Sequence, residues 1–272
     1  QFYQKSVDAY FERDYEQDVA YYRRQRRPKD DFGRSIAQHK CQTYPFRKDM
    51  FKLNLTSFFM TPVILAALLM KRRVLIEDSQ ATIVCYNCFN VPGSLPEAFQ
   101  DKEIYCLKSG ECPYYLSKKD VPFLLRFLFR SYLHPFLGLR VLIKVAKYRT
   151  LLDSFGKLEA IAVTGEFQDT SSAMTQYCRK NGVKHYNFMQ GEVFSLPRIA
   201  FFHFDKCYVW DEGYVGMFTA FGAAPAQFEV SMPQYLRKMD GTGVEKTIDY
   251  THYLDGDRGE NLEVISQSIG RL

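Results

Sequence analysis

The segment from residue 158 to residue 210 constrains the fold most, because strand-like and helix-like patterns alternate along it. Residues 158–163 form a short apolar run, which is typical of a strand buried on both faces of a parallel sheet. A helix-like segment follows, and Asn181-Gly182 is a typical helix end. Further strands are predicted at 183–189 and 206–210. This order predicts an α/β fold in which helices flank a parallel sheet.

A carboxylate follows each of these three strands. Glu166 comes after the first strand, Glu192 after the second and Asp211 after the third. Because ligands of open α/β sheets bind outside the carboxyl ends of the strands, these residues indicate a candidate site. The simpler interpretation is that they are solvated loop carboxylates or caps of the following helices, and Asp211 in particular precedes a predicted helix at 213–221.

Charge and cysteine content restrict the class of protein. The 272 residues carry a net charge of only +5, so charge alone does not indicate a nucleic-acid partner, and none is expected. Seven cysteines and no secretory signal favour a reducing, cytoplasmic location. Zinc ligation by Cys85, Cys88, Cys106 and Cys112 is an alternative to buried free thiols, but the strand-like residues 83–89 would point Cys85 and Cys88 to opposite faces. We therefore expect no metal.

The N-terminal region, residues 1–73, is predicted to be helical. Residues 1–30 read as a charged, tyrosine-rich helix, with either a solvated face or a face for an acidic lipid or polymer. Residues 53–70 are the most apolar stretch, and their length is close to the lower limit for a membrane span. Pro62 and several polar residues within it favour a buried or interfacial helix instead.

Basic and aromatic residues alternate between positions 118 and 149, and His134-Pro135 divides this stretch into two helices. Arg126 and Arg130 are four residues apart, as are Arg140 and Lys144, so the two cations of each pair share a helix face. We expect these residues to face an anionic membrane, with the protein peripheral on the inner face of the cell membrane; the alternative is two core helices with basic exposed sides. The residues are Arg126, Arg130, Arg140 and Lys144.

The remaining chain is predicted to form one α/β domain and the start of another. We assign residues 74–236 to the first domain, with two more strands near 82–86 and 104–107. Residues 237–272 contain a loop, a strand at 246–254 and a helix that begins near residue 261. We expect this to be a linker and the start of a second α/β unit, which would continue beyond Leu272.

Several segments of the chain together resemble bacterial surface-polysaccharide glycosyltransferases of the GT-B type, which have two Rossmann-like domains. One strand ends in Phe188-Met189-Gln190-Gly191-Glu192, where such proteins have Gln-His-Gly or His-Gly-Glu, and another ends in Val209-Trp210-Asp211. A short strand that ends in Pro233 then leads to the donor-binding domain in that family. The resemblance covers about 75 of 272 residues and implies that 74–236 is the N-terminal, Rossmann-like half.

The resemblance implies transfer of a sugar from a nucleotide-activated donor to a saccharide acceptor, lipid-linked or free, with no cofactor. Glu192 is then the preferred general base and Glu166 the reserve candidate. Gln190 replaces the family's histidine and cannot carry a proton, so a non-catalytic scaffold or regulator, or a peripheral membrane-binding module, stays an alternative. The predicted substrate-binding residues are Gly165, Gln190, Gly191, Arg198 and Asp211.

Overall fold

A computed structural model describes residues 15–76, 80–86, 95–96, 99, 102–107, 110, 112–191 and 197–232. The predicted elements at 237–272, together with Cys88 and Glu192, lie outside these residues. The helices are α2 (Tyr15–Arg23), α3 (Asp31–Thr43), α4 (Arg47–Met70), α5 (Val121–Arg130), α6 (Pro135–Ser154), α7 (Ser171–Lys180) and α8 (Glu212–Ala220), with short 3-10 turns η1 (Tyr44–Phe46), η3 (Lys118–Asp120), η4 (Pro197–Ile199) and η5 (Pro225–Gln227). The strands are β1 (Ile83–Tyr86), β2 (Ile104–Leu107), β3 (Ala160–Thr164), β4 (Lys184–Phe188), β5 (Lys206–Val209) and β6 (Phe228–Val230).

The six strands form one parallel sheet in the order β2-β1-β3-β4-β5-β6. The strands predicted near 160, 186 and 208 are neighbours, with Val163 opposite Asn187 and Asn187 opposite Cys207. The prediction of a Rossmann-like parallel sheet flanked by helices is confirmed. The chain runs outward from β1 to β2 and then returns to β3 on the other side of β1, so the strand order reverses between β1 and β3.

Strand β3 is apolar throughout because both of its faces are covered. Ile161 and Val163 belong to the large core cluster under the helices, whereas Ala160 and Ala162 belong to a smaller cluster on the opposite face. Phe99 packs into that second cluster. Burial on both faces explains why β3 reads as a continuous apolar run rather than an alternating one.

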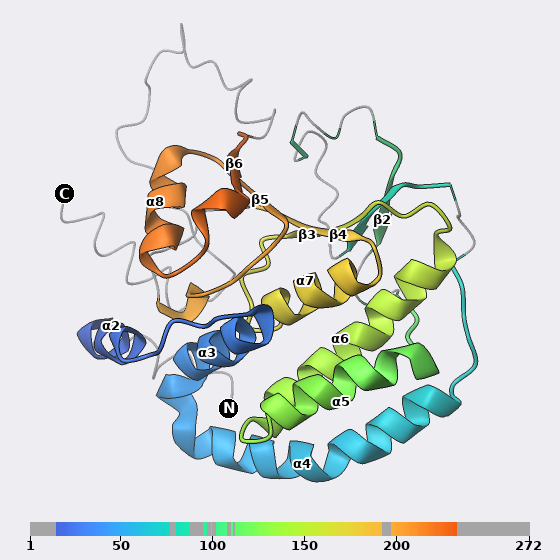
Figure 1. Ribbon diagram of the computed structural model, residues 1–272, viewed down its shortest axis with the longest axis horizontal. Helices are drawn as coiled ribbons and strands as arrows, with labels where there is room; N and C mark the ends of the chain where they lie inside the picture. The colour runs from blue at the N-terminus through green and yellow to red at the C-terminus, as the bar shows by residue number, and fades with distance from the viewer. Residues whose placement is uncertain are drawn as a thin grey trace, which may run out of the picture. The chain divides into compact units, whose positions relative to one another are not determined.

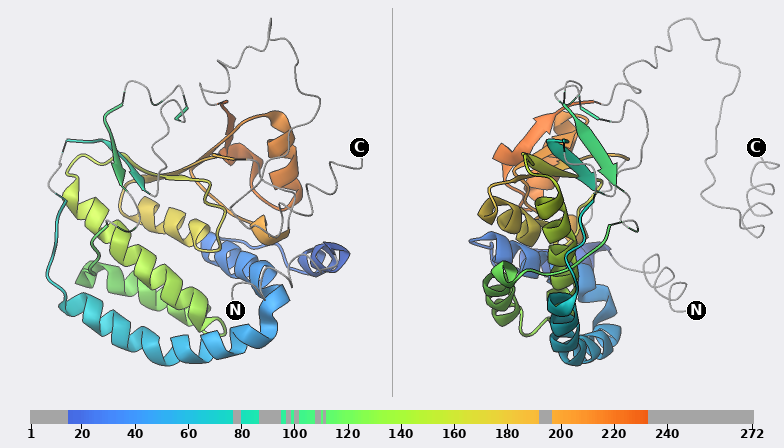
Figure 2. Two further views of the ribbon diagram at one scale, coloured as in Figure 1. Left: turned by 180° about the vertical axis from the view of Figure 1, so that it is seen from behind. Right: turned by 90° about the vertical axis from the view of Figure 1, so that its right-hand side faces the viewer.

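Two layers of helices lie on one side of the sheet. Helix α3 packs against α7, and α4 and α5 pack against α6. Figure 1 shows α6 and α7 below the sheet with α3 beside α7, and α5 and the long α4 farther from the sheet. Figure 2 shows the same arrangement from two other directions. The break between α5 and α6 falls at residues 131–134, as the His134-Pro135 pair predicts.

The helical N-terminal region is tied to the α/β part by buried hydrogen bonds. The hydroxyl of Ser35 accepts from the backbone N–H of Ala173 at 2.9 Å, and the side-chain amide of Gln38 donates to the carbonyl of Phe167 at 2.9 Å. Both donors and acceptors are removed from water, so each bond stabilises the packing of α3 on α7 and its preceding loop. In its described part, residues 15–73, the predicted N-terminal region is mainly helical, and α3 and α4 pack on the helices next to the sheet.

A buried ion pair joins the ends of the inner helices. The guanidinium of Arg149 on α6 donates to the carboxylate of Asp120 at 2.6 Å, and the hydroxyl of Tyr177 on α7 donates to the same carboxylate at 2.7 Å. These hydrogen bonds satisfy a carboxylate that is 1% exposed. The pair fixes α6 relative to α7 at the end remote from the strands' carboxyl ends.

Candidate functional site

A crevice of about 290 Å³ opens at the carboxyl ends of β1 and β3. This is the point at which the strand order reverses, and ligands of open α/β sheets bind at such a point. Tyr86 ends β1, the loop after β3 forms one wall, and α6 forms the other. The lining residues are Tyr86, Arg140, Ile143, Lys144, Lys147, Glu166, Gln168 and Thr170.

A glycine turn directs the chain into the crevice at the end of β3. Gly165 has a φ of 59°, a left-handed conformation that costs other residues about 1–2 kcal/mol. Its N–H donates to the carbonyl of Phe188 at 2.7 Å, and the next N–H, that of Glu166, donates to the side-chain oxygen of Asn187 at 3.1 Å. The end of β4 therefore fixes the backbone that carries Glu166.

Glu166 is 7% exposed and already has two side-chain hydrogen-bond donors. Its Oε1 accepts from the ammonium of Lys144 on α6 and, at 3.1 Å, from the hydroxyl of Ser171. Lys144 also donates to the hydroxyl of Thr170 at 3.3 Å, and its side chain is only 12% exposed. Because both donors contact Oε1, a ligand hydroxyl that is to give its proton to Glu166 must either approach the other carboxylate oxygen or displace these donors.

A second carboxylate lies deeper, beneath the crevice. Asp169 is fully buried and accepts two hydrogen bonds from Arg140, at 2.6 and 2.8 Å. Burial alone would raise the pKa of Asp169, but the hydrogen bond from His39 and the charges of Arg140 and Lys144 hold that pKa below its usual value. Because an ionised carboxylate only accepts, Nδ1 of His39 is the donor in the 2.7 Å contact.

The charges that line the crevice suit a ligand with many oxygen atoms. Arg140, Lys144 and Lys147 supply three cations from one face of α6, and Arg140 also donates to the amide oxygen of Gln168 at 2.9 Å. The side chain of Arg140 is 31% exposed, and the ammonium of Lys147 lies 5.9 Å from the ring centroid of Tyr86. Such donors bind hydroxyl, carboxylate or phosphate oxygens.

The structure brings only some of the predicted substrate-binding residues together. Gly165 and Gln190 are neighbours, because a Cβ at Gly165 would lie 4.0 Å from the Cβ of Gln190, and Gly191 follows at the same edge. Arg198 lies in η4, which packs against α3, and does not line the crevice. Asp211 caps α8 by accepting from the N–H of Tyr214 at 3.2 Å, as its capping alternative predicts, and it is not among the residues that line the crevice.

The predicted basic membrane face is divided by the fold. Arg140 and Lys144 were expected on that face, but they line the crevice and pair with Asp169 and Glu166. Arg126 and Arg130 are exposed on α5, where Arg130 pairs with Asp30. The spacing of four residues establishes that two side chains share a helix face, but not the direction in which that face points.

Several residues of this site had no place in the sequence prediction. Most of them lie either in the loop after β3 or on the same face of α6 as Arg140 and Lys144. Lys147 continues the i, i+4, i+7 series of that face, and Gln168, Asp169 and Thr170 lie within four residues after Glu166. These signals were present, and Tyr86 ends the strand predicted at 82–86, whereas His39 reaches the site through tertiary packing alone.

Metal ligation has no support in the described part of the chain. Among these residues, no group of three or more His, Cys, Asp or Glu side chains could hold a metal ion. Cys85 is buried and Cys106 is its exposed neighbour across the parallel β1–β2 pair, so their side chains lie in different surroundings.

No protein-family model matches the chain, and no curated protein or solved structure is similar enough to indicate its function.

Proposed function

We propose that this chain contains the acceptor-side domain of a glycosyltransferase of bacterial cell-surface polysaccharide assembly. In this proposal, a nucleotide-activated sugar is transferred to a saccharide acceptor that binds in the crevice between the ends of β1 and β3. The observation that carries the proposal is the location of this polar crevice at the reversal of strand order. The resemblance of residues 188–192 and 209–211 to GT-B proteins supports it.

The chemistry of the crevice is consistent with a saccharide ligand. Lys144, Lys147 and Gln168 offer donors to ring and hydroxyl oxygens, while Glu166 offers an acceptor. Glycosyl transfer also requires a base that takes the proton of the acceptor hydroxyl. Glu192 stays the preferred base in this proposal, because Glu166 is occupied by Lys144 and Ser171. Gln190, beside Gly165, is then a hydrogen-bonding contact to the acceptor.

The test is sugar transfer by the full-length protein, measured as nucleotide release from a panel of UDP-, GDP- and CMP-sugars with saccharide acceptors. We expect Glu192→Gln to lower the rate on the order of 10²–10⁴-fold without a change in folding, and Gln190→Ala mainly to raise KM. Glu229→Gln is a matched control, since Glu229 pairs with Lys206 across β5 and β6, outside the crevice. If Glu166→Gln is inactive and Glu192→Gln is active, the two roles are reversed.

A non-catalytic binding role is the second candidate, and one observation favours it. Glu166, the acidic side chain that lines the crevice, is held in a buried ion pair, and the adjacent strand ends in Gln190 in place of a histidine. A site of this kind can bind a saccharide without activating it. Saccharide binding to the full-length protein without nucleotide release from any donor would establish this role and overturn the transferase proposal.

A further inference from the structure

Helix α4 exposes the largest apolar surface among the described residues. Its phenylalanines Phe51, Phe58 and Phe59 are 70%, 62% and 64% exposed, and only 17% of its most apolar stretch is buried. The prediction of a helix at 53–70 is confirmed, but its burial is not. Isolated exposed apolar residues are normal on protein surfaces, whereas a contiguous apolar face marks a contact with a partner or a membrane.

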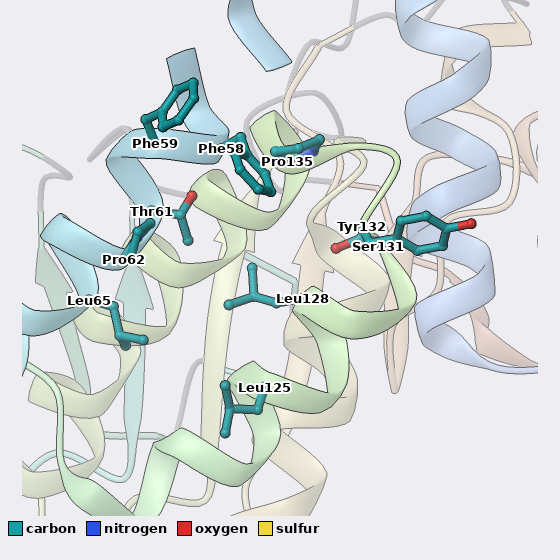
Figure 3. A pocket seen from close by; sticks show the side chains of 10 residues that line it. All are labelled: Phe58, Phe59, Thr61, Pro62, Leu65, Leu125, Leu128, Ser131, Tyr132 and Pro135. Atoms are coloured by element: carbon teal, nitrogen blue, oxygen red, sulfur yellow. The ribbon is translucent and has the colours of Figure 1, made fainter. Parts of the chain in front are cut away.

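The exposed end of α5 extends this face. Phe129 is 82% exposed, and Tyr132 and Leu133 in the following turn are 68% and 66% exposed. Between α4 and α5 lies an apolar pocket of about 430 Å³, and Figure 3 shows that side chains from both helices line it. We call this combined surface the α4–α5 face. Its pocket has room for a segment of an acyl chain.

Helix α4 buries Leu68 and two hydroxyl residues against its neighbours, while large apolar residues lie on its exposed side. Its buried positions include Ser57 and Thr61, which face the neighbouring helices, and the hydroxyl of Thr61 donates to the carbonyl of Ser57 at 2.6 Å. Helix packing through small residues and satisfied hydroxyls is typical of helices that face lipid. A surface helix of a soluble protein instead exposes mainly polar and charged residues on its outer side.

Charged residues lie at both ends of the apolar part of α4. No charged residue occurs between Lys52 and Lys71, while Lys71, Arg72 and Arg73 follow the helix directly and are exposed. Arg126 adds an exposed cation on α5. An apolar face with a cationic border matches the acyl region and the headgroups of an anionic leaflet.

The packing of α4 determines how it can meet a membrane. Among the described residues, α4 is the one helix long and apolar enough to cross a bilayer, with a stretch of 22 residues. It packs along α6, and the side-chain oxygen of Asn54 accepts from the N–H of Phe136 at 3.1 Å. Figure 2 shows α4 beside α5 and α6 over much of its length. This packing favours a helix that lies in the plane of the leaflet.

We propose that the α4–α5 face docks on an anionic lipid leaflet, with α4 in the interface plane and Lys52, Lys71, Arg72 and Arg73 at the headgroups. This inference does not depend on the proposed function, because it concerns a different surface. It also moves the membrane contact away from Arg140 and Lys144, which line the crevice.

The experiment is co-sedimentation of the full-length protein with phosphatidylcholine vesicles, with and without phosphatidylglycerol. We expect binding that requires the anionic lipid and weakens with salt, since exposed charges are screened over about 10 Å at 0.1 M salt. The double variant Phe58→Ser/Phe59→Ser should bind at least tenfold more weakly, because each exposed Phe that enters lipid contributes by its apolar area. Val230→Ser, at an exposed apolar residue on β6, is the matched control.

A charge variant separates the electrostatic part from the apolar part. Lys71→Glu/Arg72→Glu should remove the preference for anionic vesicles, while unfolding midpoints stay near that of the wild type because these side chains are exposed. Three results would overturn the proposal: binding that is indifferent to lipid charge and salt, binding unaffected by the Phe changes, or resistance to carbonate extraction, which indicates a spanning helix. A dimer that the Phe changes dissociate, without vesicle binding, would assign the face to a second copy of the chain.

Discussion

Replacing Asp169 by Asn tests whether the buried ion pair beneath the crevice holds the site together. Asp169 connects three parts of the fold: the loop after β3, Arg140 on α6 and His39 on α3. Its side chain is 0% exposed, and that of Arg140 is 31% exposed. Asparagine has almost the same shape and keeps one acceptor oxygen, so the change removes the negative charge with little change in volume.

The expected loss of stability follows from this burial. Removal of one partner of a buried ion pair costs about 3–5 kcal/mol, because the other charge stays without compensation. Here Arg140 reaches solvent in part and can regain hydration, so we expect a loss below that range, about 2–3 kcal/mol. In urea this corresponds to a midpoint lower by about 1 M or more.

The pH dependence of this loss has a definite sign. The pKa of Asp169 is lowered in the fold, so its ion pair stabilises the native state above the ordinary carboxyl pKa of 3.8 and the stabilisation is lost as the pH falls through the lowered value. The difference between wild type and Asp169→Asn should therefore be largest near neutral pH and shrink toward pH 3.

The assay is equilibrium urea unfolding of the full-length protein at several pH values, followed by far-UV circular dichroism. Glu229→Gln is the control for an exposed pair, since Glu229 and Lys206 have side chains 41% and 44% exposed and should contribute no more than about 1 kcal/mol. A loss below 1 kcal/mol for Asp169→Asn, or a loss that does not vary with pH, would refute the role assigned to this carboxylate.

Two further predictions concern single residues around the helices. Burial, followed by the charges of His39 and Lys40, lowers the pKa of His134 from 6.5 to about 4. Between pH 6.5 and pH 4 the unfolded chain therefore binds a proton that the folded chain does not bind. Because of this difference, the stability of the fold decreases as the pH falls through this window. His134→Phe should raise the free energy of unfolding at pH 5 by about 1 kcal/mol. The pKa shift alone would give about 2 kcal/mol, but the ring is partly exposed, which weakens the effect. An unchanged pH profile of urea unfolding would contradict this. Asp211→Ala should cost about 1 kcal/mol of stability through the lost cap of α8 and leave saccharide binding unchanged, whereas a loss of binding in titration calorimetry would restore Asp211 as a ligand contact.

The sequence predicts the sheet well because local signals agree there. The apolar run of β3, the glycine at 182 with a φ of 75° and the strand-like residues of β4 are each readable within about ten residues. Once strands alternate with helices, the right-handed crossover rule leaves few arrangements. The reversal of strand order at β1 is different, since strand order depends on packing among distant residues.

The candidate site was only partly predictable. Glu166 and Gly165 were found because they end a recognisable strand, but Lys144 was assigned to a membrane face because helix spacing does not show which neighbour a face meets. His39 is 130 residues away from its partner Asp169 in the chain, so no local pattern connects them.

The exposed side of α4 was only partly predictable for a related reason. Pro62 and the polar residues argued against a membrane span and left a buried or an interfacial helix as alternatives, whereas the fold buries only Ser57, Thr61 and Leu68 of residues 53–70. Composition alone does not reveal which residues of a helix face its neighbours and which face outward.

The claim that the β1–β3 crevice binds the reacting saccharide is tested most directly by one comparison of kcat/KM for sugar transfer. Lys147→Met removes a cation from the crevice without breaking the Lys144–Glu166 pair, and Lys157→Met removes an exposed cation outside it. Because a hydrogen bond to a charged group is worth about 1.5–3 kcal/mol, we expect kcat/KM to fall about 10–100-fold for Lys147→Met and to stay unchanged for Lys157→Met. Equal activity of both variants and the wild type, or no transfer by any of the three, would contradict the account.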